Sequence, residues 1–538
     1  MRLILLITVI IYSMISCTYE THEPMSAVKV EIVKTGAGYE LHRGGEPYRI
    51  KGAGLPDDDI GSFAMHGGNS IRNWGTSDTD NSTLELLDRA HAHQVTVSLC
   101  LNVPPERAGF DYGDPQAVDE LIDSVRKEVI RYKDHPALLT WIIGNELNLG
   151  YSNPMVYDVV NRISKMIREV DPNHPTTTTL SEADAHIVDL VNTRAPDLDF
   201  ISFQAYGSLF GLPDLITGVG FEGPFMVTEW GTIGYWEMET TSWGVPVELT
   251  SSEKADKVME AYQEKLVAME GQLIGSYVFM WGQKQERTPT WFGMHTESGE
   301  ETETLDVMHY IWNGDWPSNR TPRVGNLLLD GRTSRQSVVL APGQTYEARF
   351  EITDPEGGPL DYRWELKPES EARQVGGDFE APYANLDVSF SDPDAARTSI
   401  TAPGAGTYRL FAYAVDDHGK AAHANIPFKV QGDVMQTEDD LINGEVMAVA
   451  YSGFREDQHP DRGEGAVNPS DAEILEDLRI LVDHGFKLVR LYDSGENSRR
   501  TIELIREHSL PIKVLLGMWL RAEFSNHLGC PWLTEPIP

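Results

Sequence analysis

Residues 28–316 alternate short apolar runs with amphipathic helical stretches, and this repeat limits the possible folds more than any other feature. Repeated β–α units build a parallel sheet, because each helical connection returns the chain to the same edge. The runs expected to form strands are residues 48–55, 69–74, 95–103, 138–145, 176–180, 199–206, 225–229 and 275–281. Eight strands in one such stretch predict a closed (β/α)8 barrel, a TIM barrel of the α/β class.

The pattern changes at Pro317 and Pro322, after which the helical period is lost. Over residues 323–431, short alternating runs are separated by turns rich in Gly and Pro. This pattern predicts an Ig-like β-sandwich, with Trp364 and Tyr408 as core residues.

The β–α pattern returns in residues 444–538. Three strand-like runs occur there, and three strands cannot close a barrel. We therefore expect a truncated barrel segment, an interface element or one half of a site completed elsewhere, with no activity of its own.

The charged residues exclude some classes of partner. Lys and Arg number 44 against 83 Asp and Glu, a formal net charge of −39. This charge repels phosphate backbones, so no nucleic-acid partner is expected. Cys17, Cys100 and Cys530 are too few and too scattered for a disulfide framework or a structural zinc site, and neither a metal nor a cofactor is expected.

Residues 1–17 have the pattern of a secretory signal, because Arg2 precedes an apolar run that is too short to span a membrane. Ser16 before Cys17 resembles the lipobox of bacterial lipoproteins, which implies that Cys17 is lipidated and becomes the new N-terminus. We expect a lipoprotein of the outer membrane, cell surface or periplasm of a bacterium. A plain signal peptide is the alternative.

Two glutamates follow buried strands of the expected barrel. Glu146 comes after the fourth strand and Glu229 ends the seventh. The reacting groups of such barrels project from the C-terminal ends of the strands. Burying an unpaired carboxylate after apolar residues costs free energy, so two such carboxylates at one barrel mouth indicate a functional role. Paired carboxylates are what cleavage of a glycosidic bond requires.

The tripeptide Gly144-Asn145-Glu146, together with Glu229, resembles the retaining glycoside hydrolases of clan A, including the family 2 barrel. The resemblance implies that Glu146 is the general acid/base and Glu229 the nucleophile. It also implies that Asn145 binds the sugar 2-hydroxyl. In a retaining site the two carboxyl groups are about 5 to 5.5 Å apart.

Three further strand ends match the same clan. The resemblance implies that Arg72 orients the nucleophile and that Tyr206 hydrogen-bonds it. It implies that Trp281 is the floor on which the sugar at the cleavage point stacks.

Aromatic and polar side chains near the strand ends are candidates for binding substrate. Flat rings pack well against the CH faces of sugars. The candidate platforms are Trp74, Trp230, Trp236, Trp243 and Trp291. Asn102, Glu182 and Gln204 are candidates for hydrogen bonds to sugar hydroxyls.

The substrate is suggested by two resemblances. A barrel followed by one Ig-like domain is similar to glycoside hydrolase family 158, which implies endo action on β-1,3-glucan. Residues 448–455 and 486–494 resemble the opening of a family 17 barrel, which is also a β-1,3-glucan family. The resemblance carries no catalytic residue into that segment. We expect a retaining endo-β-1,3-glucanase of the laminarin type, acting by double displacement.

Other functions remain open at this point. The same site could serve a β-1,3-glucan transglycosylase, because a covalent glycosyl-enzyme can be resolved by a sugar instead of water. It could also serve a β-mannanase, a β-galactosidase or an exo-β-glucosidase. A glycan-binding lipoprotein on an inactive barrel is disfavoured by the presence of both glutamates.

Overall fold

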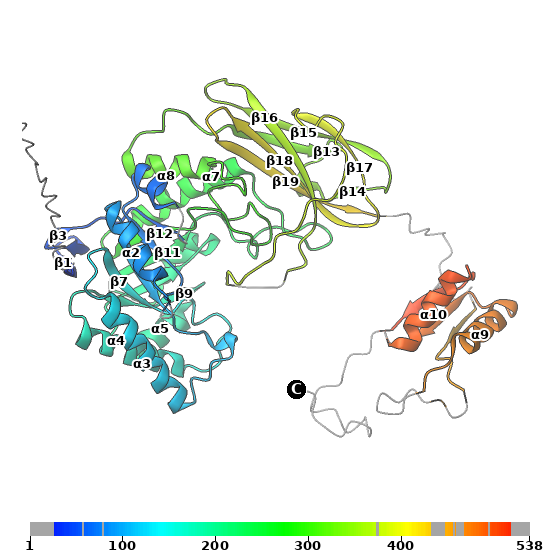
Figure 1. The fold of residues 1–538 in the computed structure, drawn as a ribbon, viewed down its shortest axis with the longest axis horizontal. Helices are drawn as coiled ribbons and strands as arrows, with labels where there is room; N and C mark the ends of the chain where they lie inside the picture. Colours follow the sequence, from blue (N-terminus) through cyan, green and yellow to red (C-terminus); the bar gives the residue numbers. More distant parts are fainter. Residues whose placement is uncertain are drawn as a thin grey trace, which may run out of the picture. The chain divides into compact units, whose positions relative to one another are not determined.

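The computed structural model describes residues 26–55, 59–77, 80–372, 376–431, 447–455, 458, 467–492 and 495–517. The chain divides into two compact units, Met1–Gly432 and Asp433–Pro538, which are described separately (Figure 1). The expected signal segment, Cys17 and Cys530 lie outside the described residues.

The first unit contains a closed parallel barrel, as the β–α repeat predicts. Its strand segments are β4 (Gly52–Gly54), β5 (Ser70–Arg72), β6 (Thr96–Leu101), β7 (Leu138–Ile143), β8 (Thr176–Thr177), β9 (Thr179–Ser181), β10 (Ile201–Gln204), β11 (Phe225–Trp230) and β12 (Leu273–Val278). Their order in the sheet is β8-β7-β6-β5-β4-β12-β11-β10-β9, with parallel pairing throughout. The fifth strand is split at Thr178, and its two pieces β8 and β9 close the ring.

Helices cover the barrel. They are α1 (Ile60–Met65), α2 (Ser82–Ala92), α3 (Pro115–Tyr132), α4 (Met155–Val170), α5 (Ala185–Arg194), α6 (Leu212–Gly218), α7 (Ser251–Ala261) and α8 (Glu303–Asn313). The apolar stripe of α4 is buried against the strands, as its spacing predicts. The start of α3 is fixed by Asp114, whose side chain accepts hydrogen bonds from the backbone N–H groups of Gln116 and Ala117. In the part of the chain that the structure describes, no helix is long and apolar enough to cross a membrane.

An antiparallel sheet closes the N-terminal end of the barrel. It consists of β1 (Val30–Thr35), β2 (Gly38–Arg43) and β3 (Glu46–Pro47). Val30 and Leu41 of this sheet form one apolar cluster with Leu139, Met226 and Ile274, which lie at the beginnings of barrel strands. The opposite, C-terminal end is therefore the end at which a cavity can open.

The β-sandwich also agrees with the sequence prediction. Its strands are β13 (Arg323–Leu329), β14 (Val338–Leu340), β15 (Thr345–Thr353), β16 (Leu360–Pro368), β17 (Arg397–Thr401), β18 (Gly406–Asp416) and β19 (Ala421–Val430). They form two sheets, ordered β13-β15-β17 and β14-β19-β18-β16. Trp364 is buried in the core between them, and Tyr408 is half-buried against it.

Buried charges join the sandwich to the barrel. Lys254 of α7 forms a buried ion pair with Glu248, whose carboxylate also accepts a hydrogen bond from Asn425 of β19 at 2.6 Å. Burial opposes the charge of Glu248, but Lys254 and Arg409 outweigh it and lower the pKa of this carboxyl to about 2. Arg409 of β18 also donates to the carbonyl oxygen of Pro246 at 3.0 Å. Removing one partner from such a buried set of charges would leave another charge unpaired and destabilise the protein. These contacts therefore fix the sandwich against the barrel.

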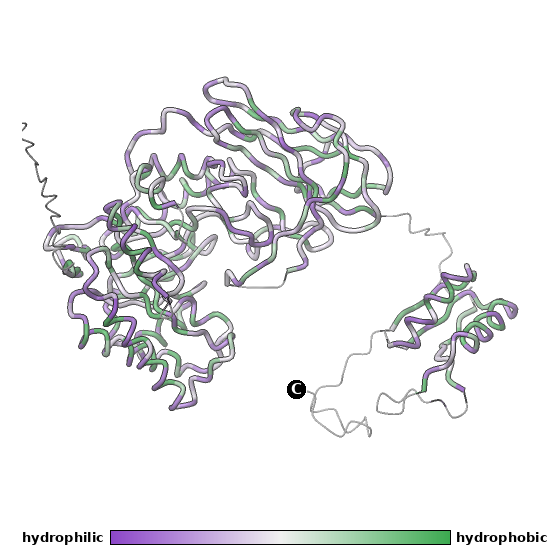
Figure 2. Tube along the Cα trace, in the orientation of Figure 1, coloured by the Kyte–Doolittle hydropathy of each residue, from purple (hydrophilic) through white to green (hydrophobic). Residues whose placement is uncertain are grey.

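The second unit is small. Its elements are β20 (Ala448–Ala450), α9 (Asp471–Asp483), β21 (Leu488–Leu491), α10 (Glu496–Glu507) and β22 (Lys513–Leu516). The three described strands pair in parallel in the order β20-β21-β22, as the truncated β–α pattern predicts. Apolar and polar residues alternate along α9 and α10 (Figure 2), and their apolar sides share a core with Tyr451 and Val489.

Candidate active site

A cavity of about 830 Å³ opens at the C-terminal ends of the barrel strands. Both predicted catalytic residues, Glu146 and Glu229, line it. Each carboxyl group is buried within a hollow that is large enough for several sugar units.

Four donors surround the Glu229 carboxylate. Its Oε1 atom accepts hydrogen bonds from Arg72 Nη1 at 2.6 Å, Trp74 Nε1 at 2.8 Å and Gln204 Nε2 at 3.0 Å. Its Oε2 atom accepts one from the Tyr206 hydroxyl at 2.7 Å. Four hydrogen bonds to its two oxygen atoms fix the orientation of the Glu229 carboxyl group in the cavity.

The donors are themselves held in place. Arg72 is fully buried, and its second terminal nitrogen donates to Asn145 Oδ1 at 2.8 Å. Gln204 Nε2 donates to the same oxygen at 2.9 Å. Burial and the negative charge of Glu229 raise the pKa of Tyr206 well above its usual value, so its hydroxyl stays protonated and keeps donating. The carboxylate is thus positioned by a rigid network.

Glu146 lies in a different environment. It follows β7 in a tight turn with φ of 48°, in which its backbone N–H donates to Thr179 Oγ1 at 2.9 Å. Burial, followed by the charge of Glu229, raises the pKa of the Glu146 carboxyl to about 8. Glu146 therefore carries a proton near neutral pH, as a general acid needs, whereas the Glu229 carboxyl group accepts hydrogen bonds from four donors.

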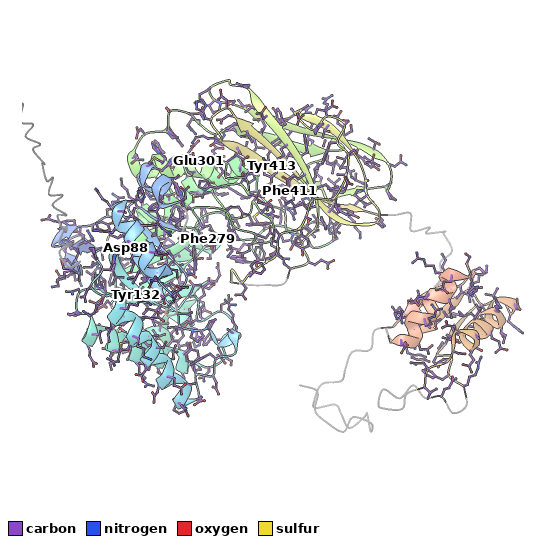
Figure 3. All side chains as sticks on the ribbon, in the orientation of Figure 1. Asp88, Tyr132, Phe279, Glu301, Phe411 and Tyr413 are labelled. Atoms are coloured by element: carbon purple, nitrogen blue, oxygen red, sulfur yellow. The ribbon has the colours of Figure 1, made fainter. Side chains whose placement is uncertain are left out.

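Aromatic rings form one wall of the cavity. The ring of Phe279, which Figure 3 labels, packs edge to face against the rings of Trp74 and Tyr206. The ring centroids are 5.7 Å apart for Trp74 and 5.8 Å apart for Tyr206. Trp236 also lines the cavity and is 47% exposed, so its face is available to a sugar. Trp74 and Trp236 thus lie where the sequence predicts platforms.

Trp281 is not the floor of the site, contrary to the prediction. Strand β12 ends at Val278, so the alternation of faces does not extend to residue 281. The Trp281 ring is fully buried and packs against Phe63 and Trp312, behind the barrel wall. Phe279 is the strand-eight ring that lines the cavity.

The predictions for Trp230 and Trp291 are also wrong. Trp230 directly follows Glu229 in β11, and successive side chains of a strand point to opposite faces. Its ring therefore packs outward and stacks on Tyr262 at 6.3 Å. Trp291 is buried behind Tyr235, with its indole N–H donating to the Ile233 carbonyl oxygen at 3.0 Å, and it is absent from the cavity lining. Trp243 does not line the cavity either.

Other lining residues include both predicted and unpredicted ones. Asn102 and Glu182 line the cavity, as expected for groups that bind hydroxyls, whereas Gln204 contacts Asn145 and Glu229. The sequence prediction missed Arg107, Lys284 and residues 376–378. Arg107 and Lys284 follow β6 and β12, so their place after strand ends was a usable signal.

The charges of the cavity are mainly negative. Among the described lining residues, the two cations each have an acidic partner: Arg107 pairs with Asp378 at 2.7 Å and Lys284 with Glu286 at 3.1 Å. Among the described residues, no group of three or more His, Cys, Asp or Glu is placed to hold a metal ion. The site is suited to an uncharged ligand, because an anionic one would meet the acidic side chains of Glu182, Glu229 and Glu286.

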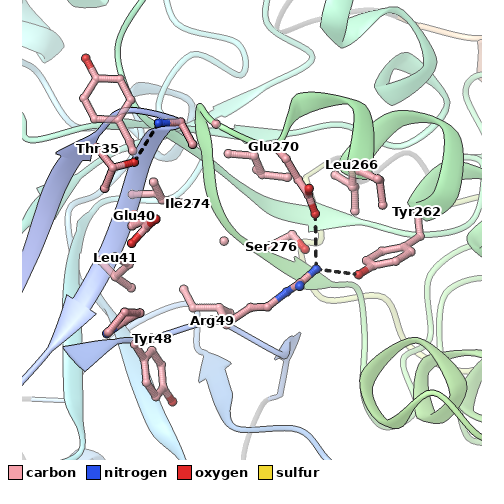
Figure 4. A pocket seen from close by; sticks show the side chains of 18 residues that line it. Thr35, Glu40, Leu41, Tyr48, Arg49, Tyr262, Leu266, Glu270, Ile274 and Ser276 are labelled. Carbon is pink, nitrogen blue, oxygen red and sulfur yellow. Dashed lines mark hydrogen bonds and ion pairs between the residues drawn. The ribbon is translucent and has the colours of Figure 1, made fainter.

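A second cavity of about 490 Å³ lies between β1–β2 and the turn of helix at Tyr262–Leu266 (Figure 4). Arg49 contacts Glu270 at 3.5 Å and Tyr262 at 3.4 Å there. The side chains of this ion pair are 75% and 64% exposed, and such an exposed pair contributes little to stability. The chemistry of the barrel is at the other end.

Comparisons with known proteins agree with this site. The family model for the TIM barrel domain of glycosyl hydrolases family 2 matches residues 79–231, which include both glutamates. Mannan endo-1,4-beta-mannosidase F of Aspergillus clavatus is 32% identical over 194 residues, covering 30% of this chain and 44% of that protein. The protein of the same name from Aspergillus fumigatus is 30% identical over 113 residues, covering 18% of this chain and 26% of its own length.

Solved structures of other proteins are also similar to parts of this chain. A Bacteroides uniformis beta-glucuronidase matches with a TM-score of 0.40 and 13% identity, covering 75% of this chain and 48% of that one. A glycoside hydrolase family 5 mannosidase from Rhizomucor miehei matches with a TM-score of 0.39 and 14% identity, covering 54% and 97%.

The fold of this chain is a closed parallel barrel, and its residues 79–231 are similar to the TIM barrel domain of glycosyl hydrolases family 2. The chain spans less than half the length of the two curated relatives described above.

Proposed function

We propose that the barrel hydrolyses a neutral β-linked polysaccharide with retention of configuration. The observation that carries the proposal is the difference between the two carboxyl groups. Glu229 accepts hydrogen bonds from four side chains, whereas burial keeps Glu146 protonated with a pKa of about 8. A retaining glycosidase needs this pair.

In the first step, the Glu229 carboxylate attacks the anomeric carbon and the bond to the leaving oxygen breaks. Glu146 donates its proton to that oxygen, so the leaving sugar departs as an alcohol. In the second step, Glu146 takes a proton from water, and the resulting hydroxide attacks the same carbon. The bond to Glu229 breaks and the carboxylate is restored. Two displacements give net retention.

β-1,4-Mannan is the first candidate substrate. It is supported by the curated relatives, which are named mannan endo-1,4-beta-mannosidases. β-1,3-Glucan, which the sequence favoured, is the second candidate and rests on the arrangement of a barrel followed by one sandwich. The acidic cavity supports a neutral polymer in either case.

The test is the product profile of the whole chain with β-1,4-mannan, β-1,3-glucan, mixed-linkage glucan and galactan, beside the Glu229→Gln variant. Short manno-oligosaccharides from the wild type alone would support the first candidate. Laminari-oligosaccharides alone would support the second. Products longer than an oligosaccharide substrate would indicate transglycosylation, and identical profiles for wild type and variant would contradict the proposed site.

We also propose that the protein is exported and anchored by lipid at Cys17. Support comes from the apolar run and Ser16-Cys17 in residues 1–17. Metabolic labelling with a fatty-acid analogue should mark the wild type and leave the Cys17→Ser variant unmarked. Equal labelling of both would contradict the anchor.

A further inference from the structure

A long connection between two strands of the sandwich reaches the barrel mouth. It joins β16 to β17, spans residues 369–396, and is much longer than a hairpin turn. Residues 376–378 of this connection line the cavity that contains Glu146 and Glu229. The active site is thus built from two domains.

Gly377 and Glu380 of this connection are attached to the barrel loop after β12. Glu380 is 7% exposed, and its carboxylate accepts hydrogen bonds from Gln285 Nε2 at 3.1 Å and the Arg287 backbone N–H at 2.9 Å. Lys284 Nζ donates to the Gly377 carbonyl oxygen at 3.1 Å. These contacts hold residues 377–380 beside the eighth strand.

The same segment is also attached to the loop after β6, through Asp378, which lies between Gly377 and Glu380. Arg107, which lies after β6, donates to Asp378 Oδ2 at 2.7 Å. In the sheet, β5 and β4 lie between β6 and β12. The segment therefore contacts loops that follow two barrel strands separated by β4 and β5.

The segment approaches the acid/base closely. A Cβ atom added to Gly376 would lie 2.6 Å from Leu149 and 3.3 Å from Glu146 Oε2. The backbone there has φ of +63°, which also favours glycine. No side chain fits between this backbone and the carboxyl group without displacing one of them.

The beginning of the connection is fixed as well. Arg409 forms a buried ion pair with Glu369 at 2.9 Å, directly after β16, and donates to the Pro246 carbonyl oxygen of the barrel. The connection therefore begins at a residue that buried contacts hold in place.

We propose that residues 376–378 are a wall of the substrate cleft that limits how many sugar units bind beside Glu146. This inference rests on the proposed function and deepens it. The sandwich thereby determines the length of neutral oligosaccharide that the site accepts.

Two variants test the wall, with one matched control. Asp378→Ala removes the bond to Arg107, and Gly376→Ala places a methyl group against Glu146 and Leu149. Gly357→Ala is the control, because Gly357 has φ of +76° in another loop of the sandwich and open space around it. The Tm of each protein shows whether it is folded.

The measurement is the ratio of kcat/KM for a hexasaccharide to kcat/KM for a 2,4-dinitrophenyl monoglycoside of the same sugar. The monoglycoside places one sugar in the site and needs no acid catalysis. We expect the ratio to change by about fivefold or more in both variants, and to stay within about twofold in the control. The oligosaccharide products should change in length as well.

Folded variants that retain the wild-type ratio and product lengths would overturn the wall and leave the proposed function intact. If Gly376→Ala does not fold, Asp378→Ala alone decides. A wild-type protein that cleaves neither substrate would overturn the proposed function, and the wall with it.

Discussion

Glu146 and Glu229 carry the same chemical group, but the residues around them assign different roles. Glu229 contacts Arg72 and Tyr206, and Glu146 is buried beside Ser181 and Thr179. Exchanging either carboxyl for an amide removes the nucleophile or the proton donor. We expect Glu229→Gln and Glu146→Gln each to lower kcat on the polysaccharide by about 10³-fold or more while the protein remains folded. Full activity in either folded variant would contradict the assignment.

Azide separates the two roles. In Glu146→Ala, azide should restore turnover of an activated aryl glycoside and give a product of retained configuration, because Glu229 still forms the intermediate. In Glu229→Ala, azide should attack directly and give the inverted product. NMR of the glycosyl azides distinguishes these outcomes, and the opposite stereochemistry would exchange the roles.

The pH dependence follows from the raised pKa of Glu146, about 8. The first step needs the protonated acid, so kcat/KM on the polysaccharide should be retained below this value and fall as pH rises through it. A 2,4-dinitrophenyl glycoside needs no acid catalysis, so its kcat/KM should not fall in this pH range. A fall already complete by pH 6 would contradict the pKa and the role.

At the scale of residues, the sequence predicts which side chains are functional but not always the face of the strand to which each side chain points. Glu146, Glu229, Arg72 and Tyr206 all meet in one cavity or hydrogen-bond network, because the ends of parallel strands converge. Trp230 was misplaced because it directly follows Glu229 and so points to the other face. That error could have been avoided from alternation alone.

At the scale of elements, the turn after β7 positions both Asn145 and Glu146. Gly144 has φ of +73°, and an added Cβ atom would lie 2.8 Å from Leu147, which is fully buried. We expect Gly144→Ala to lower the free energy of unfolding by about 2 kcal/mol and kcat by at least about tenfold.

Gly299→Ala is the control for this turn. Gly299 has φ of +93° and nothing within 4 Å of an added Cβ atom, so it shares the backbone strain without the contact. Its kcat should remain at the wild-type value. Denaturant unfolding and kinetics measure both variants, and equal effects in both would contradict a special role for the turn.

The elements themselves were largely predictable. Each expected barrel strand is present, although the fifth is split at Thr178, and the runs of the sandwich are strands. Periodicity is a local property and predicts elements well. The position of residues 376–378 was not predictable, because Asp378 meets Arg107 across 271 residues and no local pattern encodes that contact.

At the scale of the whole molecule, barrel and sandwich share a buried ion pair between Asp306 of α8 and Lys420 and should unfold together. Arg409→Met leaves Glu369 without its buried partner and should lower the free energy of unfolding by about 3 kcal/mol. Arg397→Met is the control, because Arg397 and Glu347 are 61% and 55% exposed and such pairs contribute less than about 1 kcal/mol. Equal losses in both variants would contradict the importance of the interface.

The second unit has its own core and should be dispensable for catalysis. A chain ending at Gln431 keeps every residue that lines the active-site cavity. We expect its kcat/KM on the polysaccharide to stay within about twofold of the full chain. A large loss in a folded protein would show that the second unit contributes to the site.

The most direct test of the account is to trap the glycosyl-enzyme. A 2-deoxy-2-fluoro glycoside with an activated leaving group slows the second displacement more than the release of the leaving group, so the covalent intermediate accumulates. Mass spectrometry of the digested protein should find one sugar attached to Glu229, and none in Glu229→Gln. A label on another residue would contradict the assigned nucleophile. Turnover of the natural substrate with inversion of configuration would contradict the double displacement itself.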